Sequence, residues 1–502
     1  MLYKIRLIVA GIFFLLITML FLDFTGTVHL WFGWLAKIQL IPAILAVNII
    51  AIIILAVLTL FFGRIYCSVI CPLGVLQDGI SNIAGKRKKN RFRYSSAKSW
   101  IRYSILGLFI IAIILGGSAI VSLFDPYAAY GRVTANFFTP LYRWGNNLLN
   151  WFAERVDSYA FYPTEVWLKG WITFATAAIT LIVVGILAWR NGRTYCNTIC
   201  PVGTVLGFLA RFSIFKPEFD VEKCKKCGLC ERNCKASCID VNHFTIDKSR
   251  CVTCFNCMEK CNFGAIKYAP AMIGKKKNST TEIASEKNGV GSDGLSRRGF
   301  MSIAGIFALT QTVKAQQLRG DGGLAEIQDK KIPERITSLV PAGSMSLRNM
   351  NKHCTACQLC VSACPNHVLR PSAKLATLMQ PEMSYEKGYC RPECTKCSKV
   401  CPTGAIRAIT PADKSSISIG KAVWIKDNCL VNRDEIQCNS CTNHCPTGAI
   451  TLVAINADDE NSLKLPVVNK ELCIGCGACE NLCPARPFSA MYVEGNVIHH
   501  SI

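Results

Sequence analysis

Residues 224–234 read CKKCGLCERNC and residues 251–261 read CVTCFNCMEKC. Both segments have the spacing Cys-x2-Cys-x2-Cys-x3-Cys, in which three close thiolates bind one 4Fe-4S cluster and the fourth reaches the neighbouring cluster. Zinc is the alternative, but zinc sites favour paired Cys-x-x-Cys dyads. The pattern therefore predicts two crossed clusters, one held by Cys224, Cys227, Cys230 and Cys261 and the other by Cys251, Cys254, Cys257 and Cys234.

Three residues depart from the simplest form of this pattern. Lys235 and Asn262 stand where proline usually follows the fourth cysteine, which removes no ligand. Cys238 is left over, and we expect a plain buried thiol there rather than a substitute for Cys234.

The whole chain is rich in cysteine, apolar and basic. It has 502 residues with 29 cysteines, 51% hydrophobic residues, 56 Lys and Arg, and 33 Asp and Glu. This length excludes a small disulfide-rich secreted domain. A multihaem c-type cytochrome is excluded because Cys-x-x-Cys-His does not occur. An apolar and basic composition is typical of a membrane protein with charged flanks.

Four further cysteine runs, each ending in Cys-Pro, follow in the C-terminal part. Two are regular and two have stretched first gaps. Because the irregular runs are the inner ones, we expect a nested arrangement, with an inner ferredoxin inserted into an outer one; sequential pairing is the alternative. The nested outer ligands are Cys354, Cys357, Cys360 with Cys483, and Cys473, Cys476, Cys479 with Cys364. The nested inner ligands are Cys390, Cys394, Cys397 with Cys445, and Cys429, Cys438, Cys441 with Cys401.

Four apolar runs, at residues 5–22, 39–62, 104–123 and 171–189, are of about the length that crosses roughly 30 Å of hydrocarbon. They predict four transmembrane helices. The loop between the second and third runs is rich in Lys and Arg, so we expect it in the cytoplasm, with the nearly balanced loop at 125–169 exported. This topology explains the run KRKKNRFR at 86–93 better than nucleic-acid binding does, and we expect no nucleic-acid partner.

A short motif occurs twice beside these runs, as GRIYCSVICPLG at 63–74 and GRTYCNTICPVG at 192–203. The repeat indicates an internal duplication of the membrane unit. Its four thiols, Cys67, Cys71, Cys196 and Cys200, suffice for one tetrahedral metal or cluster or for two redox-active pairs. Inert buried thiols are the alternative.

The segment between the cysteine-rich parts resembles a targeting signal. Residues 271–295 are rich in Lys, Ser, Thr, Asn and Gly and predict a flexible linker. Ser296-Arg297-Arg298-Gly299-Phe300-Met301 then opens a short apolar stretch that ends near Ala315, a pattern similar to a twin-arginine export signal. Residues 296–315 are therefore either a cleaved signal or a fifth span.

Taken together, these motifs resemble a known pair of protein families. Residues 1 to about 270 look like the NapH/MauN type of membrane ferredoxin, and residues 296–502 are similar to the NapG/MauM type, as if the two were fused. The resemblance implies a quinol dehydrogenase of anaerobic respiration that takes electrons from the membrane quinone pool and passes them to a periplasmic cytochrome or reductase, with nitrate reductase the best-known client. The alternatives are assembly or reductive maintenance of a periplasmic metalloenzyme such as nitrous oxide reductase, and feeding by a cytoplasmic reductant.

The resulting prediction is a membrane α-helical protein with α+β bacterial-type ferredoxin domains and six 4Fe-4S clusters. We expect a four-span domain at 1–215, a cytoplasmic two-cluster ferredoxin at 216–270, the linker, the signal, and an exported four-cluster polyferredoxin at 316–502. In the inner membrane, residues 190–295 would lie in the cytoplasm and the C-terminal domain in the periplasm. His29, Asp125, Tyr127 and Tyr130 lie at predicted outer ends of spans and are candidates to accept quinol protons, although interfacial anchoring explains the tyrosines equally well.

Overall fold

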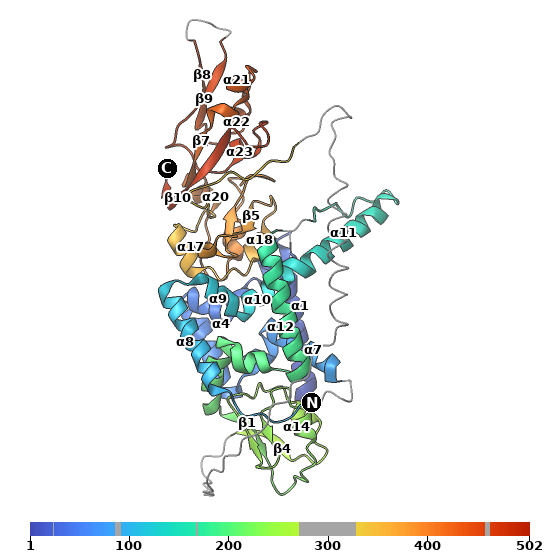
Figure 1. The fold of residues 1–502 in the computed structure, drawn as a ribbon. Coiled ribbons are helices and arrows are strands. Elements are labelled where there is room, and N and C mark those ends of the chain that lie inside the picture. The colour runs from blue at the N-terminus through green and yellow to red at the C-terminus, as the bar shows by residue number, and fades with distance from the viewer. Residues whose placement is uncertain (24, 86–91, 167–168, 271–327, 457–461) are drawn as a thin grey trace, which may run out of the picture. The chain divides into compact units, whose positions relative to one another are not determined.

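The structure, a computed structural model, describes residues 1–23, 25–85, 92–166, 169–270, 328–456 and 462–502 (Figure 1). The chain divides into two compact units. The described residues 1–270, 332–485 and 489–502, with the gaps given above, belong to the larger unit, and the described residues of the smaller unit are 328–331 and 486–488. The predicted linker at 271–295 and the predicted twin-arginine segment at 296–315 lie outside the described residues.

The first part of the larger unit is helical. The motif segments of the duplication form α6 (Ile65–Val69) and α7 (Pro72–Gly85) in the first copy, and η2 (Tyr195–Ile199) and α13 (Pro201–Leu209) in the second. The remaining elements are α1 (Leu2–Leu22), α2 (Thr27–Phe32), α3 (Trp34–Lys37), α4 (Leu40–Leu45), α5 (Ile49–Phe62), α8 (Ser99–Leu115), α9 (Ser118–Phe124), α10 (Pro126–Val133), η1 (Thr134–Phe138), α11 (Thr139–Glu154), α12 (Trp171–Asn191) and η3 (Ala210–Phe212).

Two of the four predicted spans are uninterrupted helices. α1 and α12 have 21 residues each and are long and apolar enough to cross a membrane. In the most apolar 18-residue segment of each helix, only 28% (α1) and 22% (α12) is buried, whereas the core helix of a soluble protein is mostly buried. Their exposed apolar side chains therefore favour contact with lipid.

The other two predicted spans are broken. The run at 39–62 forms α4 and α5, and the run at 104–123 forms α8 and α9. The breaks have local causes, since Val47 and Gly116 have positive φ angles of 52° and 76°, and Asn48 caps α5 by accepting a hydrogen bond from the Ala51 N–H. The prediction of one continuous helix per run was wrong at these two places.

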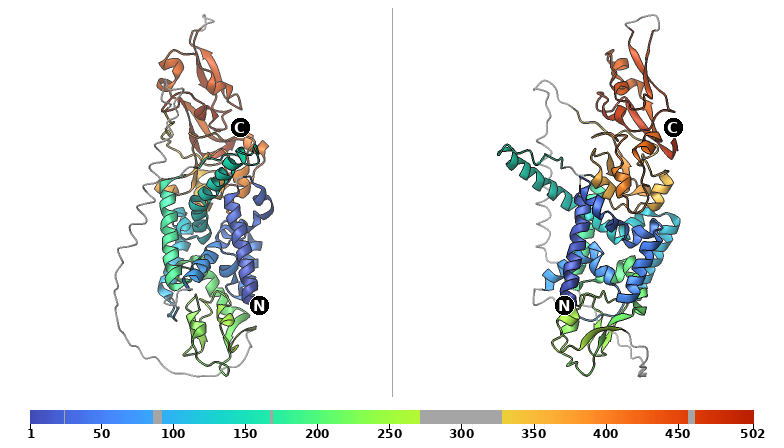
Figure 2. Two further views of the ribbon diagram at one scale, coloured as in Figure 1. Left: turned by 90° about the vertical axis from the view of Figure 1, so that its right-hand side faces the viewer. Right: turned by 180° about the vertical axis from the view of Figure 1, so that it is seen from behind.

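α7 packs against α1, α10 and α12, so the first motif copy lies at the centre of the helical part. α11, by contrast, projects away from the other helices (Figure 2). Its apolar residues, among them Leu141, Trp144 and Leu148, are largely exposed.

Residues 215–270 form a small α+β fold. β1 (Phe215–Phe219) pairs antiparallel with β4 (Ile266–Pro270), and β2 (Ile239–Asp240) pairs with β3 (Thr245–Ile246). The short helices α14 (Leu229–Arg232) and α15 (Asn256–Glu259) each contain the third cysteine of a run.

The C-terminal part repeats this plan. The hairpin β5 (Leu369–Pro371) and β6 (Pro381–Met383) and the hairpin β8 (Ile450–Ala454) and β9 (Lys464–Val468) each join two cysteine runs, and β7 (Ile417–Trp424) pairs with β10 (Met491–Ser501). The helical elements are α17 (Leu347–His353), α18 (Leu359–Ala363), η5 (Leu375–Thr377), α19 (Lys396–Val400), α20 (Pro411–Ser416), η6 (Lys426–Asn428), α21 (Leu430–Arg433), α22 (Ser440–Asn443) and α23 (Ala478–Asn481).

Candidate iron–sulfur centres

The eight predicted ligands at 224–261 line two separate cavities. One cavity is lined by Cys224, Cys227, Cys230 and Cys261, and the other by Cys234, Cys251, Cys254 and Cys257. The fourth cysteine of each run thus joins the first three of the other, which is the crossed grouping that the spacing predicts.

Cys238 lines the second of these cavities as well. It is buried, as expected, but its Sγ lies 3.6 Å from the Sγ of Cys234. The surplus thiol is therefore within reach of the same centre, so the alternative that Cys238 substitutes for Cys234 stays open beside the expected plain buried thiol.

The C-terminal cysteines form four groups, and their pairing is sequential. Group A consists of Cys354, Cys357, Cys360 and Cys401, whose thiols act on one another electrostatically. The other three groups line one cavity each: group B is Cys364, Cys390, Cys394 and Cys397, group C is Cys429, Cys438, Cys441 and Cys483, and group D is Cys445, Cys473, Cys476 and Cys479.

The nested arrangement was therefore wrong. Two short hairpins cause the sequential pairing. The hairpin β5–β6 brings the run at 354–364 back against the run at 390–401, and the hairpin β8–β9 does the same for the last two runs. The predicted ligand residues are unchanged, and only their partners differ.

The four regular runs share a backbone conformation that fits a bound cluster. In each, the residues two and four positions after the first cysteine have positive φ: Lys226 and Gly228, Thr253 and Phe255, Ala356 and Gln358, Gly475 and Gly477. For a non-glycine residue this conformation costs about 1–2 kcal/mol, so its recurrence indicates a constraint from the site. Backbone N–H groups in such turns form a concave anion-binding surface, and the Ala356 N–H points to the Cys354 Sγ at 3.4 Å.

The geometry suits an extended cluster better than a single ion. Within the described ranges, no group of three or more His, Cys, Asp or Glu side chains lies close enough to hold one metal ion. The thiols instead stand around cavities, as the corners of a 4Fe-4S cubane require, and four thiolates complete its ligation.

The duplicated motif brings its four cysteines together in the interior. Cys67, Cys71, Cys196 and Cys200 are all buried, and burial raises the pKa of the Cys71 and Cys200 thiols. A thiol with a raised pKa is a poor nucleophile and a poor metal ligand until a partner removes its proton. Which of the predicted roles these thiols have stays a prediction.

Two fully buried arginines reach crosswise between the copies. Arg64 Nη2 donates to the main-chain oxygen of Cys196 at 3.1 Å, and Arg193 Nη1 donates to that of Cys67 at 2.7 Å. A Cβ atom on Gly74 or Gly203, the last residue of each motif, would collide with these same carbonyl groups. The final glycine of each copy thus leaves room for a carbonyl group of its own copy and for the arginine of the other copy, which bonds to that carbonyl.

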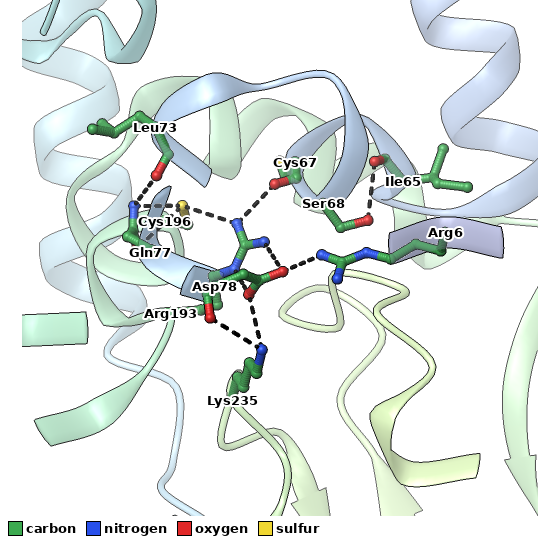
Figure 3. A network of polar contacts seen from close by, with 10 residues as sticks. All are labelled: Arg6, Ile65, Cys67, Ser68, Leu73, Gln77, Asp78, Arg193, Cys196 and Lys235. Carbon is green, nitrogen blue, oxygen red and sulfur yellow. Dashed lines mark hydrogen bonds and ion pairs between the residues drawn. The ribbon is translucent and has the colours of Figure 1, made fainter. Parts of the chain in front are cut away.

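Arg193 also belongs to a buried charge network centred on Asp78 (Figure 3). The Asp78 carboxylate accepts from Arg193 Nε at 2.9 Å and contacts Arg6 and Lys235, all with side chains at most 5% exposed. Burial alone would raise the pKa of Asp78, but the charges of Arg193, Lys235 and Arg6 outweigh it and lower that pKa.

Lys235 connects this network to the neighbouring thiols. It follows Cys234 directly, its Nζ lies 3.7 Å from Asp78 Oδ1, and its main-chain oxygen accepts from the Arg193 N–H at 2.7 Å. The residue that stands in place of proline therefore anchors the ferredoxin loop to the helical part. Lys235 and Asp78 are 157 positions apart, so no local sequence signal could reveal this contact.

The four candidate proton acceptors have different surroundings. Both oxygens of Asp125 cap α10 by accepting from Tyr127 and Ala128 N–H groups, and the Tyr130 hydroxyl is bonded to Thr18 at 2.6 Å. The Tyr127 hydroxyl is buried with no hydrogen-bond partner in the described part of the chain. His29 pairs with Asp23, which sequence reasoning missed.

One further buried cation was missed. Arg132 on α10 is fully buried, and none of its guanidinium nitrogens has a hydrogen-bond partner among the residues that the structure describes. The charges of Asp125 and Cys357 act on it, so it lies in the vicinity of group A.

Comparison with protein-family models supports iron–sulfur binding. A model described as a 4Fe-4S binding domain matches residues 44–91 and 172–219, which contain the two copies of the duplicated motif. A model described as a 4Fe-4S dicluster domain matches residues 353–405 and 436–486, a division that agrees with sequential pairing.

Several known proteins are similar to parts of this chain. The ferredoxin-type protein NapG of Escherichia coli is 32% identical over 207 residues, which cover 36% of this chain and 87% of NapG. The methylamine utilization ferredoxin-type protein MauM of Methylobacillus flagellatus is 27% identical over 35% of this chain and 76% of MauM. The putative electron transport protein YccM of Escherichia coli is 22% identical over 44% of this chain.

The chain spans only part of some of these relatives. It covers 55% of YccM and 42% of the uncharacterized protein MJ0749 of Methanocaldococcus jannaschii, with which it is 36% identical over 104 residues. No solved structure matches the chain significantly.

Proposed function

Because this chain belongs to the NapG/MauM family of ferredoxin-type proteins and is an iron–sulfur electron-transfer protein, we propose that it is a membrane-bound quinol dehydrogenase. It oxidises quinol at the helical part and passes the electrons through six 4Fe-4S clusters to a periplasmic cytochrome or reductase. Nitrate reductase is the client that the resemblance to NapG-type proteins implies. The cluster ligands are the 24 cysteines of the two groups at 224–261 and of groups A to D.

The observation that carries this proposal is the direct packing of the group A cluster loop on the helical part. A Cβ atom on Gly131 of α10 would collide with the main-chain oxygen of Cys357 in group A, and Asn136 Nδ2 donates to Gln358 Oε1 at 3.4 Å. Electrons tunnel efficiently only between closely spaced centres. A cluster at group A is therefore well placed to accept electrons released at the helices.

The proposed topology follows the basic loop and the twin-arginine motif. Residues 190–295 lie in the cytoplasm and the C-terminal part lies in the periplasm of the inner membrane. A periplasm-specific reporter fused after Ile502 should be active, and changing both Arg297 and Arg298 to Lys should abolish its activity. Unchanged activity in that variant would contradict export by the twin-arginine pathway.

The electron source is tested with the full chain in proteoliposomes. Addition of a menaquinol or ubiquinol analogue should reduce the clusters, as followed by electron paramagnetic resonance, and a periplasmic acceptor should reoxidise them. Clusters that stay oxidised with quinol but are reduced by a cytoplasmic ferredoxin would overturn the proposal in favour of feeding from the cytoplasm.

The second candidate function is reductive maintenance of a periplasmic metalloenzyme through the four buried thiols of the duplicated motif. Their burial and the raised pKa of Cys71 and Cys200 disfavour thiol exchange, because the thiolate is the reactive form. Retention of quinol-dependent cluster reduction when Cys71 and Cys200 are changed to Ser would separate the electron path from such a role.

A further inference from the structure

Asp23 and His29 form a fixed pair in the turn after α1. Asp23 Oδ1 accepts from the N–H groups of Gly26 at 2.7 Å and Thr25 at 3.0 Å, and from the Thr25 hydroxyl at 2.8 Å. Asp23 Oδ2 accepts from the His29 N–H at 3.1 Å and lies 3.1 Å from His29 Nδ1. The carboxylate is thus held in place by the backbone and in turn holds the imidazole ring.

This pairing determines which ring nitrogen is available. A carboxylate can only accept, so Nδ1 carries the proton and Nε2 is the acceptor of the neutral ring. Burial lowers the pKa of His29 more than Asp23 raises it, which keeps the ring neutral at pH 7. The pair has the arrangement of an oriented base.

The acceptor nitrogen has no partner. The His29 side chain is 8% exposed, and its Nε2 is buried without a hydrogen bond to any residue that the structure describes. A buried polar atom without a partner costs about 1–3 kcal/mol. A ligand hydroxyl that donates to Nε2 would remove this cost.

The surroundings of the pair suit an amphipathic ligand. On the same short helices, Leu30, Trp31 and Trp34 are 82%, 73% and 52% exposed, and tryptophan is enriched at membrane interfaces. On the other side, Lys396 Nζ donates to the main-chain oxygen of Thr25 at 3.3 Å, and Lys396 directly precedes Cys397 of group B. A lipid-facing surface and a cluster loop therefore flank the same turn.

We infer that His29 is the base that takes the proton from a quinol hydroxyl, with Asp23 as its positioning residue. The inference rests on the proposed quinol dehydrogenase function. In each half of the reaction a quinol O–H bond would break and an N–H bond would form at Nε2. The clusters that the cysteines of groups A and B would hold would take up the one electron released in that half. His29 then releases its proton to the exported face and takes the second one, so that quinol loses two protons and two electrons and leaves as quinone.

The test uses the full chain in proteoliposomes with decylubiquinol or a short-chain menaquinol as the electron donor. His29→Gln keeps a polar side chain but cannot accept the proton, and we expect quinol-dependent cluster reduction to slow by about 10²- to 10⁴-fold. Reduction by dithionite and the resonance spectra should be unchanged. Imidazole in the buffer should partly restore the rate of His29→Ala.

Asp23→Asn tests the positioning role, because an amide can hold the ring in the other tautomer. We expect kcat to fall with little change in KM. The matched control is His243→Gln. His243 Nδ1 also pairs with an aspartate, at 2.7 Å from Asp240 Oδ2, but its side chain is 79% exposed on the ferredoxin at 215–270. Its rate should equal that of the unmodified chain.

The outcomes separate the two hypotheses. If the unmodified chain is reduced by quinol and His29→Gln reacts at the same rate, the inference about His29 is overturned and the proposed function stands. If quinol reduces no cluster of the unmodified chain, while dithionite does, the proposed function itself fails.

Discussion

Replacing Asp78 with Asn should loosen the contact between the helical part and the first ferredoxin. The change keeps the side-chain volume and one acceptor oxygen but removes the negative charge that pairs with Arg6, Arg193 and Lys235. Arg6, Arg193 and Lys235 would then face one another with side chains at most 3% exposed. Like charges without a counter-charge are strongly unfavourable in the interior.

The magnitude follows from the distances. At an effective dielectric constant of about 20, a unit-charge pair at 2.9 Å, the Arg193–Asp78 separation, is worth roughly 6 kcal/mol before desolvation. Breaking a buried pair by removing one partner costs about 3–5 kcal/mol net. Because the folded-state pKa of Asp78 is lowered, its stabilisation is present above the unfolded pKa and is lost only in strong acid, so the cost should be the same from pH 5 to pH 8.

Hydrogen–deuterium exchange measures this loss locally. The Arg193 N–H, which donates to the main-chain oxygen of Lys235, should exchange about 10²- to 4 × 10³-fold faster in Asp78→Asn, since 1.4 kcal/mol is a factor of ten. The control is Asp220→Asn, whose side chain is 25% exposed and lies 3.4 Å from Lys267; an exposed pair of this kind contributes about 0–1 kcal/mol. If the Arg193 N–H exchanged at the same rate in Asp78→Asn and in Asp220→Asn, the reasoning would be refuted.

Three further predictions concern the rest of the chain. Cys401→Ser should remove one cluster, about four iron atoms per chain, and adding Cys354→Ser should remove no more; a loss of about eight in an iron assay would instead support nested pairing. Gly131→Ala should lower the thermal midpoint through a clash worth about 1–3 kcal/mol, whereas Gly145→Ala, with nothing within 4 Å of the new Cβ, should not; equal midpoints would contradict the packing of α10 on group A. Burial lowers the pKa of His499 to about 4, so at pH 5 the unfolded chain binds a proton that the folded chain does not. Acidification from pH 7 to pH 5 should therefore lower the free energy of unfolding by up to about 2 kcal/mol. His499→Gln should flatten the pH dependence of the thermal midpoint, and an unchanged slope would be the contrary result.

Local ligand spacing was the most informative part of the sequence. The exchange of Cys234 and Cys261 between two centres follows from the run itself, because the geometry of a cluster loop is set within eleven residues. The pairing of the C-terminal runs does not follow, since nested and sequential arrangements use identical spacings. The hairpin that decides it has strands β5 and β6 of only three residues each, too short to produce a recognisable alternation.

Long-range polar contacts were beyond sequence reasoning for a different reason. The sequence marks the segment that contains Asp78 only as rich in Lys and Arg, and it marks Lys235 only as a residue that replaces a proline. Only the fold shows that they meet, because their pairing depends on how two elements 157 positions apart are brought together. The breaks in two predicted spans were partly visible, since Gly116 and Gly117 interrupt one apolar run and Asn48 interrupts the other.

The crosswise reach of Arg64 and Arg193 has an evolutionary consequence. Each arginine donates to a carbonyl group in the other copy of the motif, so a single copy would lack the acceptor that this hydrogen bond needs. An ancestor with one copy would meet this need by pairing with a second molecule about a two-fold axis, as most homodimers do. The two copies also differ in the present chain: Asp78 after the first copy corresponds to Gly207 after the second, so only the first half carries the acid that contacts Lys235 of the ferredoxin.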